Sequence, residues 1–188
     1  MDYGQMDLER EYLWACSTVR DLHEHLPCLT MLASGCQHVT EFGISLGMSG
    51  RAFLMGLQRP GCQLVSCDLE IDPEAKRLVS VPSICTYTQI ESNVLDIEIA
   101  ETDLLFLDTR HTYLQLTSEL RLHHSKVRKF IVLHDTTSFG HKNEVDDGSQ
   151  KEGLIPAIQE FLALRPEWTV WRAYWNCNGL MILKRIAQ

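Results

Sequence analysis

The sequence predicts an α/β fold built on a doubly wound, mostly parallel sheet, and three observations carry this prediction. Strand-like and helix-like runs alternate from about residue 38 to residue 164, which is typical of a parallel sheet with helices on both faces. Two strand-like runs, Leu104–Leu107 and Phe130–Leu133, are continuously apolar, as central strands buried on both faces are. Near the C-terminus, two further strand-like runs flank the turn-forming segment Asn176–Gly179, which predicts an antiparallel hairpin at one edge.

The predicted elements begin with a helical N-terminal segment. Residues 7–34 carry apolar side chains at helical spacing, and Pro27 divides them into two segments. The five parallel strands expected next are His38–Phe42, Gln63–Cys67, Ile84–Gln89, Asp103–Leu107 and Lys129–Leu133. Helices are expected from about Gly50, through Glu74–Val79, through Tyr113–His123 and over Leu154–Leu164. The final hairpin consists of the strands Trp168–Tyr174 and Gly179–Lys184, which completes a sheet of seven strands.

Composition and charge exclude several classes of protein. The 188 residues, 45% of them hydrophobic, suffice for one domain over residues 1–188 and hardly for two. A net charge of −8 without a long basic run argues against a nucleic-acid partner. The N-terminus lacks the apolar region of a signal peptide, and no apolar run reaches about 18 residues, so we expect a soluble, cytoplasmic protein with no membrane partner. The seven cysteines form no C-x-x-C pair, which favours reduced thiols over a disulfide framework or a zinc site.

The most informative local feature is the glycine-rich segment Glu41–Gly50, which follows the first predicted strand and leads into a helix. Glycines let the backbone turn sharply and approach a ligand, and the first N–H groups of the following helix offer hydrogen-bond donors. This segment therefore predicts a nucleotide-type cofactor loop. Its spacing is E-x-G-x-x-x-G and not the G-x-G-x-x-G of a dinucleotide site. The alternative is a tight strand-to-helix turn without a ligand.

The second predicted strand ends in an acid, Asp68, about 20 residues beyond the glycines, as the ribose-binding acid of doubly wound sheets does. A carboxylate at that position accepts hydrogen bonds from ribose hydroxyls. The alternative is an exposed acid that caps the helix near Pro73. With the glycine loop, Asp68 predicts a cofactor at the carboxyl ends of the strands, and the helical segment 1–36 is expected to pack over that end.

The predicted sheet, the acidic glycine loop and the acid after the second strand resemble the class I S-adenosylmethionine-dependent methyltransferases over nearly the whole chain. The resemblance implies a Rossmann-like methyltransferase fold with S-adenosyl-L-methionine as the cofactor. In that family the loop wraps the methionine part of the cofactor, the acid holds the ribose, and the next residue lies against the adenine. The first role falls to Glu41, Gly43, Ser45, Gly47 and Ser49, the second to Asp68 and the third to Leu69. The segment Glu91–Asp96 is expected near the adenine rim.

The segment Leu107–Leu120, at the end of the fourth predicted strand, is similar to the D-x-x-H-x-Y…E-L signature of the cephalosporin-hydroxylase-like and macrolide-sugar O-methyltransferase group. The resemblance implies that Asp108 touches the cofactor or a metal and that His111 is the general base. A hydroxyl is a poor nucleophile until its proton is removed, and histidine accepts protons near neutral pH. The alternative makes Asp108 the cap of a helix that begins near Thr112, and His111 a polar residue of its first turn.

The fifth predicted strand ends in His134 and Asp135, where metal-dependent relatives carry two adjacent acids. The ends of two central strands lie close together, so Asp108, Asp135 and His134 form a candidate site for Mg²⁺ or another divalent cation. Carboxylates suit magnesium, whereas an imidazole favours softer metals. The alternative is that His134 and Asp135 shape the acceptor pocket without a metal, with His134 as a second candidate for the base.

Together these features predict an S-adenosylmethionine-dependent methyltransferase that acts on a small molecule at a hydroxyl oxygen. Two alternatives stay open: a protein that binds S-adenosylmethionine or S-adenosylhomocysteine without turnover, and a nucleotide-cofactor enzyme on the same fold. The sequence identifies neither the acceptor nor the number of subunits, so a homo-oligomer is also open. The long irregular segment Thr136–Glu152 is expected to be a binding loop or a disordered lid.

Overall fold

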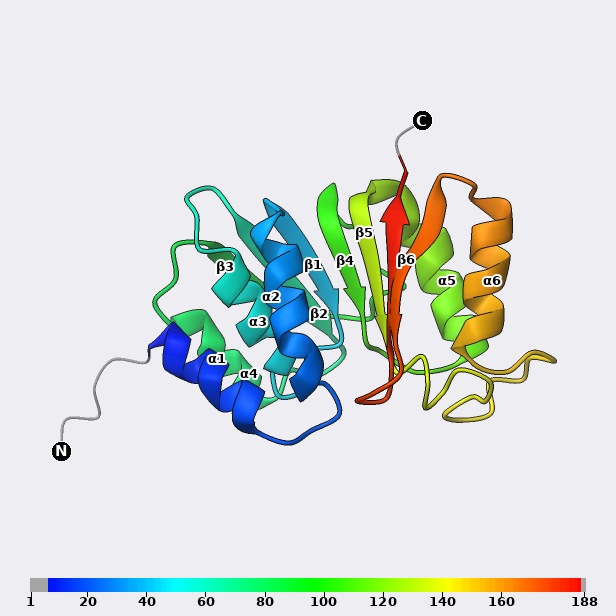
Figure 1. Ribbon diagram of the computed structural model, residues 1–188, viewed down its shortest axis with the longest axis horizontal. Helices are drawn as coiled ribbons and strands as arrows, with labels where there is room; N and C mark the ends of the chain where they lie inside the picture. Colours follow the sequence, from blue (N-terminus) through cyan, green and yellow to red (C-terminus); the bar gives the residue numbers. More distant parts are fainter. Residues whose placement is uncertain (1–6, 187–188) are drawn as a thin grey trace.

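A seven-stranded sheet forms the centre of the computed structural model, which describes residues 7–186 (Figure 1). The strands lie in the order β3-β2-β1-β4-β5-β7-β6. They are β1 His38–Phe42, β2 Gln63–Asp68, β3 Thr86–Glu91, β4 Thr102–Leu107, β5 Val127–His134, β6 Trp168–Tyr174 and β7 Leu180–Arg185. Strands β1 to β5 pair in parallel, whereas β7 runs antiparallel to both β5 and β6. The predicted fold class, with its C-terminal hairpin, is confirmed.

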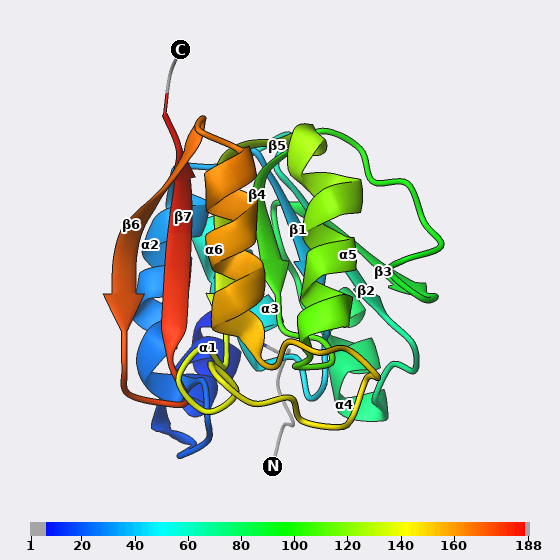
Figure 2. The same ribbon diagram turned by 90° about the vertical axis from the view of Figure 1, so that its right-hand side faces the viewer.

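Helices cover both faces of the sheet, as Figure 2 shows. One face carries α1 Leu8–Ser17, α2 Leu26–Ser34 and α3 Met48–Gly56, and the other carries α5 Tyr113–His123 and α6 Leu154–Leu164. Strand β4 is buried along its whole length, and its side chains alternate between two apolar clusters. Leu104 and Phe106 pack with Phe53 of α3, whereas Leu105 and Leu107 belong to the cluster that includes α5 and α6. A continuously apolar strand is therefore needed at this position.

Several predicted boundaries shift in the structure. The N-terminal helices separate between Ser17 and the short 3-10 helix His23–His25, and Pro27 lies in the first turn of α2, where its missing N–H costs nothing. Helix α3 begins at Met48. The helix expected through Glu74–Val79 is α-helical only over α4, Pro73–Lys76, and continues as a 3-10 turn over Arg77–Ser80. Strand β3 begins two residues later than expected, because its first residue to pair with β2 is Thr86.

The connection from β3 to β4 contains no helix, and none is predicted there. Residues 92–101 cross the sheet as an irregular strap, visible to the right of α5 in Figure 2. Buried Val94 and Ile99 attach this strap to the sheet. On the face of the sheet that carries α5 and α6, these two helices therefore cover only part of the strands, and the strap covers another part. Within residues 7–186, none of the helices has the length and apolar character needed to span a bilayer.

Candidate active site

The loop between β1 and α3 lies directly against the end of β4. Gly43, Ser45 and Gly47 all have positive φ angles, of 85°, 46° and 74°. A Cβ atom on Gly43 would lie 1.9 Å from the carbonyl oxygen of Asp108, so only glycine allows this approach. The Asp108 N–H donates to the carbonyl of Phe42 at 2.9 Å. The glycine loop and the Asp108 motif, which are far apart in sequence, thus meet at one edge of the sheet.

Asp68 at the end of β2 holds the same loop. One carboxylate oxygen accepts hydrogen bonds from the N–H groups of Ile44 and Ser45, at 2.7 and 3.2 Å, and the other accepts from Leu69 at 2.7 Å. The helix near Pro73 is capped by Asp72, whose carboxylate accepts from the Glu74 N–H at 2.7 Å. The alternative in which Asp68 is a helix cap is therefore wrong.

A cleft of about 390 Å³ opens at the carboxyl ends of β1, β2 and β4. It is lined by Gly43, Ser45, Cys67, Asp68, Leu69, Asn93, Val94, Asp108, Thr109, Arg110 and Gln115. Five residues predicted to bind the cofactor meet here: Gly43, Ser45, Asp68, Leu69 and Asp108. Asn93 and Val94 come from the segment expected at the adenine rim. In doubly wound sheets ligands bind outside the carboxyl ends of the strands, which is where this cleft lies.

The structure places the remaining predicted loop residues behind the cleft. The Glu41 side chain is fully buried and accepts hydrogen bonds from the hydroxyl groups of Ser49 and Ser66. Gly47 faces Leu78, since a Cβ atom there would lie 2.6 Å from that side chain. Burial raises the pKa of the Glu41 carboxyl to about 7, against the hydrogen bonds from the two serines. Glu41, Gly47 and Ser49 therefore support the loop from the α3 side of the sheet.

The raised pKa of Glu41 predicts how the stability of the fold depends on pH. The folded state binds the Glu41 proton more tightly than the unfolded chain does, so protonated Glu41 stabilises the fold. This contribution to the free energy of unfolding is complete below pH 4.5 and is lost as pH rises through about 7. In the wild type, Glu41 should lower the free energy of unfolding by on the order of 2 to 3 kcal/mol between pH 4.5 and 7.5, and Glu41→Gln should not show this decrease. Urea unfolding at both pH values measures this. The exposed Glu70→Gln should unfold like the wild type, and an unchanged pH slope in Glu41→Gln would refute the account.

Four ionisable side chains cluster at the ends of β4 and β5. The Nε2 atom of His111 lies 3.2 Å from Asp108 and 3.0 Å from Asp135. The Nδ1 atom of His134 lies 3.3 and 3.2 Å from the same two carboxylates. The His111 ring stacks on Phe139, with the ring centroids 4.9 Å apart. The predicted residues His111, Asp108, Asp135 and His134 are thus brought together.

The start of α5 excludes one alternative for this motif. The side chain of Thr112 accepts a hydrogen bond from the Gln115 N–H at 3.3 Å and is the N-cap of the helix. Asp108 lies four residues before the cap, and its carboxylate contacts His111 and His134. The alternative in which Asp108 caps this helix is therefore wrong.

The cluster contains two positive and two negative charges. Burial alone would lower the pKa of His111, but hydrogen bonds to Asp108 and Asp135 and their charges raise it to about 10. The same opposing effects raise the pKa of His134 to about 11. Burial would raise the pKa values of both aspartates, but the two histidines lower them. The two aspartates thus favour the protonated imidazole of His111, so a role as a base requires a ligand that lowers this pKa.

His134 has hydrogen-bond partners on both ring nitrogens. Its Nε2 atom lies 3.2 Å from the carbonyl oxygen of Asp21 and 3.0 Å from that of Cys177. Carbonyl oxygens only accept, so Nε2 carries a proton, and Nδ1 faces the two carboxylates. The side chain is fully buried. His134 therefore serves as a fixed cation behind Asp108 and Asp135, and its two ring nitrogens are occupied.

A candidate set of metal ligands is formed by Asp108, His111 and Asp135, whose donor atoms lie within 4.8 Å of one another. His111 thus takes the place that was predicted for His134. Two carboxylates and an imidazole are a donor set that suits manganese, iron or zinc better than magnesium.

Sequence reasoning assigns no role to Glu144 or Glu119. The carboxylate of Glu144 lies 3.2 Å from both the backbone N–H and the Nδ1 atom of His111. Glu119, buried in α5, accepts from the hydroxyl of Thr109 at 2.5 Å. The only sequence signal for Glu144 is its place in the irregular segment 136–152, which follows β5 and in the structure lies against the start of α5. Glu119 belongs to the E-L part of the Leu107–Leu120 motif.

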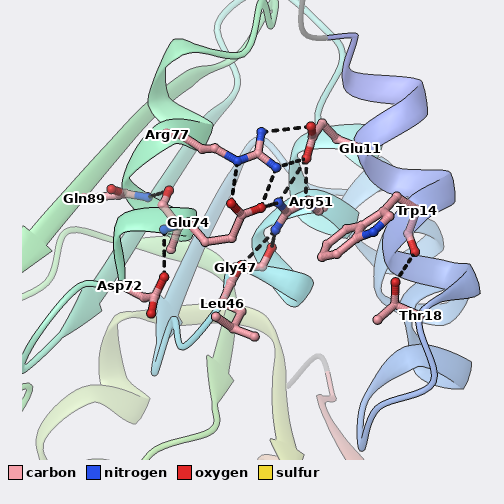
Figure 3. A network of polar contacts seen from close by, with 11 residues as sticks. Glu11, Trp14, Thr18, Leu46, Gly47, Arg51, Asp72, Glu74, Arg77 and Gln89 are labelled. Atoms are coloured by element: carbon pink, nitrogen blue, oxygen red, sulfur yellow. Dashed lines mark hydrogen bonds and ion pairs between the residues drawn. The ribbon is translucent and has the colours of Figure 1, made fainter.

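The helix α1 is attached to the glycine loop through a buried arginine (Figure 3). The Arg51 guanidinium donates to the carbonyl oxygens of Leu46 and Gly47 at 2.8 and 3.0 Å. It also pairs with Glu11 of α1 at 3.0 Å and with Glu74 of α4 at 2.7 Å. Arg77 contacts the same two carboxylates, which completes a network of two positive and two negative side chains. This network places α1 beside the loop at the carboxyl end of β1.

A second cavity, of about 430 Å³, lies between the strap 92–101 and the sheet. Its lining includes His38, Thr40, Phe42, Val65 and Ile99. It lies on a face of the sheet and not beyond the carboxyl ends of the strands, and it contains none of the clustered acids and histidines. We therefore place the candidate active site in the cleft that contains Asp68 and Asp108, although the second cavity is slightly larger.

Solved structures, several of them of methyltransferases, share this architecture at low sequence identity. A Corynebacterium glutamicum protein matches with a TM-score of 0.68 and 18% identity, over 96% of this chain and 88% of that one. An O-methyltransferase from Bacillus cereus in complex with SAH matches with a TM-score of 0.65 and 15% identity, over 95% and 89%. An O-methyltransferase from Streptomyces achromogenes involved in tomaymycin synthesis, in complex with SAM, matches with a TM-score of 0.62 and 18% identity, over 97% and 87%.

By sequence, no protein-family profile and no curated protein matches the chain. At identities of 15–18%, the structural matches show the fold alone. The chain therefore has the Rossmann-like fold of S-adenosylmethionine-dependent methyltransferases, and the chemistry of its site has to be argued from its own residues.

Proposed function

We propose that this protein transfers a methyl group from S-adenosylmethionine to a hydroxyl group of a small molecule. The observation that carries the proposal is the cleft at the carboxyl ends of β1, β2 and β4, where the positive-φ glycine loop, Asp68 and Asp108 meet. The shared fold supports it, because the matched structures include O-methyltransferases in complex with SAM or SAH. The narrower likeness to the macrolide-sugar O-methyltransferase group rests on the Leu107–Leu120 motif alone.

The residues of the cleft fit this cofactor. A volume of about 390 Å³ lies within the range of about 300–1,000 Å³ that small-molecule sites occupy. Gly43 and Ser45 would contact the methionine part, Asp68 the ribose hydroxyls, and the exposed side chain of Leu69 the adenine. When bound, the cofactor supplies a methyl group on a positively charged sulfonium. Holding the acceptor in line with that group contributes much of the rate enhancement.

His111 is the proposed general base. When its imidazole is neutral, Nδ1–H donates to Glu144, and the lone pair on Nε2 lies between Asp108 and Asp135. Nε2 would take the proton of the acceptor hydroxyl, and the two aspartates would stabilise the imidazolium that forms. A positive charge entering the cleft beside Asp108 lowers the pKa of His111 toward neutrality, because like charges disfavour the protonated imidazole. His134 keeps the two carboxylates oriented from behind.

A divalent cation on Asp108, His111 and Asp135 is the alternative arrangement of the same site. It excludes the base role, because a cation and a substrate proton would both use Nε2 of His111. Treatment with EDTA separates the two arrangements. The proposed base mechanism keeps full turnover in EDTA, whereas loss of turnover that manganese or magnesium restores would assign Nε2 to a metal.

Removal of the Asp68 carboxylate is expected to weaken cofactor binding. Asp68→Ala should raise the Kd for S-adenosylhomocysteine by about tenfold or more, since a hydrogen bond to a charged acceptor contributes roughly 1.5–3 kcal/mol. Part of the loss would come from the loop, because Ile44 and Ser45 also donate to this carboxylate. Asp72→Ala, which removes a cap in the same region, is the control for folding and should bind normally. An unchanged Kd in Asp68→Ala would sink the ribose assignment.

A further inference from the structure

A second group of potential metal ligands lies behind His134, outside the cleft. It consists of His23 and Glu24, in the short 3-10 helix before α2, and Cys177, in the turn between β6 and β7. Their ligand atoms lie within 4.8 Å of one another. The cysteine comes from a segment that is distant in sequence from the other two residues, so no ligand spacing in the chain could indicate this group.

One distance within this group matches zinc coordination. The Nδ1 atom of His23 lies 3.5 Å from the sulfur of Cys177. Zinc binds sulfur at about 2.3 Å and nitrogen at about 2.0–2.1 Å with tetrahedral geometry, which places the two ligand atoms about 3.6 Å apart. A soft thiolate with an imidazole and a carboxylate is a donor set that favours zinc over magnesium or calcium.

We propose that His23, Glu24 and Cys177 bind a zinc ion, with a water molecule in the fourth position. The thiol of Cys177 loses its proton to solvent on binding, so the thiolate and the Glu24 carboxylate balance the charge of the ion. The Nδ1 atom of His23 exchanges its contacts with the N–H and the carbonyl oxygen of Arg20 for the metal. Asn176 donates from its side chain to Glu24 and orients that carboxylate from outside.

This site connects two segments that position His134. The carbonyl oxygens of Asp21 and Cys177 both accept from Nε2 of His134, and each lies in or next to one of the segments that the metal would join. A bound zinc ion would hold the turn before α2 against the β6–β7 turn. It would thereby fix the position of the His134 side chain behind Asp108 and Asp135. The inference that zinc binds does not rest on the proposed methyl transfer, because the three ligands lie outside the cleft.

Cobalt is the probe for the test, because a thiolate ligand gives Co²⁺ a charge-transfer absorption band in the near ultraviolet that oxygen and nitrogen ligands do not give. CoCl₂ titrated into the metal-free, reduced full-length protein should produce this band, and ZnCl₂ should displace it. Cys177→Ser should remove the band. Cys16→Ser, which changes another half-buried thiol, and Asp135→Asn, which alters the other ligand cluster, should both keep it. A band that survives in Cys177→Ser, or none in the wild type, would overturn the proposal.

The other two ligands are tested by affinity. Glu24→Gln and His23→Gln should each weaken Co²⁺ binding by more than about tenfold, since even outer-sphere partners of a metal contribute 10–100-fold. Zinc should also raise the Tm of the wild type and of Cys16→Ser, but not that of Cys177→Ser, because a ligand that binds only the folded state stabilises it. Equal Tm shifts in the wild type and Cys177→Ser would place the zinc elsewhere.

Discussion

Replacement of His111 by glutamine is expected to lower the turnover by about 10²–10⁴ while the affinity for the cofactor stays close to that of the wild type, because this is the usual contribution of a positioned base. The His111 ring does not line the cofactor cleft but meets its edge at Asp108, where the acceptor would lie, so the loss should appear in kcat. Single-turnover methylation measures the rate, and S-adenosylhomocysteine binding measures the affinity. His141→Gln, an exposed histidine in the irregular segment, is the matched control.

The role of His111 as a base also predicts how the methylation rate depends on pH. Only the neutral imidazole accepts a proton, and Asp108 and Asp135 hold the pKa of His111 at about 10. The positive charge of the bound cofactor lowers this pKa, so the wild-type rate should rise with pH and level off below pH 10, once the imidazole is neutral. His111→Gln should lose this rise and His141→Gln should keep it. Near-normal turnover of His111→Gln with the wild-type pH profile would refute the role of His111.

Gly43→Ala is expected to abolish cofactor binding and to destabilise the fold strongly. The new Cβ would meet the Asp108 carbonyl oxygen at 1.9 Å, and the backbone φ of 85° is strained for any residue with a side chain. The loop and the end of β4 would have to separate, at a cost on the order of 3 kcal/mol or more. Thermal unfolding and S-adenosylhomocysteine titration measure the two effects.

Gly61 offers a matched control, because its φ is 80° but no atom lies within 4 Å of the position that a Cβ would take. Gly61→Ala bears the backbone strain alone and should bind the cofactor normally with a modest loss of stability, about 1 kcal/mol. If Gly43→Ala and Gly61→Ala had the same effects, the close approach of the loop to Asp108 would not be the reason that position 43 needs glycine.

The sheet could be predicted because its signal is local. The apolar run Leu104–Leu107 is buried between the helices on the two faces of the sheet. The turn Asn176–Gly179 connects the two strands of the hairpin, as expected. The boundaries of β3 and the strap after it could not be predicted in the same way. Strand β3 lies at the edge, where its limits depend on pairing with β2, and its alternating exposed side chains give no continuous apolar signal.

For the site, the sequence indicates which strand ends meet but not the direction of each side chain. The glycine-loop motif groups Glu41 with the cofactor residues, although alternation along β1 places it beside Ser66 of β2, on the face covered by α3. His134 is predicted to be a ligand or a base, and its Nε2 partners are the backbone carbonyls of Asp21 and Cys177. Such partners come from segments distant in sequence, and any residue type supplies a carbonyl, so no motif records them.

The central claim is that the cleft beside Asp68 binds S-adenosylmethionine and its product. Calorimetric titration of the purified protein with S-adenosylhomocysteine tests it most directly, with NAD titrated in parallel. We expect one S-adenosylhomocysteine molecule to bind per chain and NAD to give no heat, because the loop lacks the G-x-G-x-x-G spacing of a dinucleotide site. Binding of NAD in preference to S-adenosylhomocysteine, or of neither, would contradict the account.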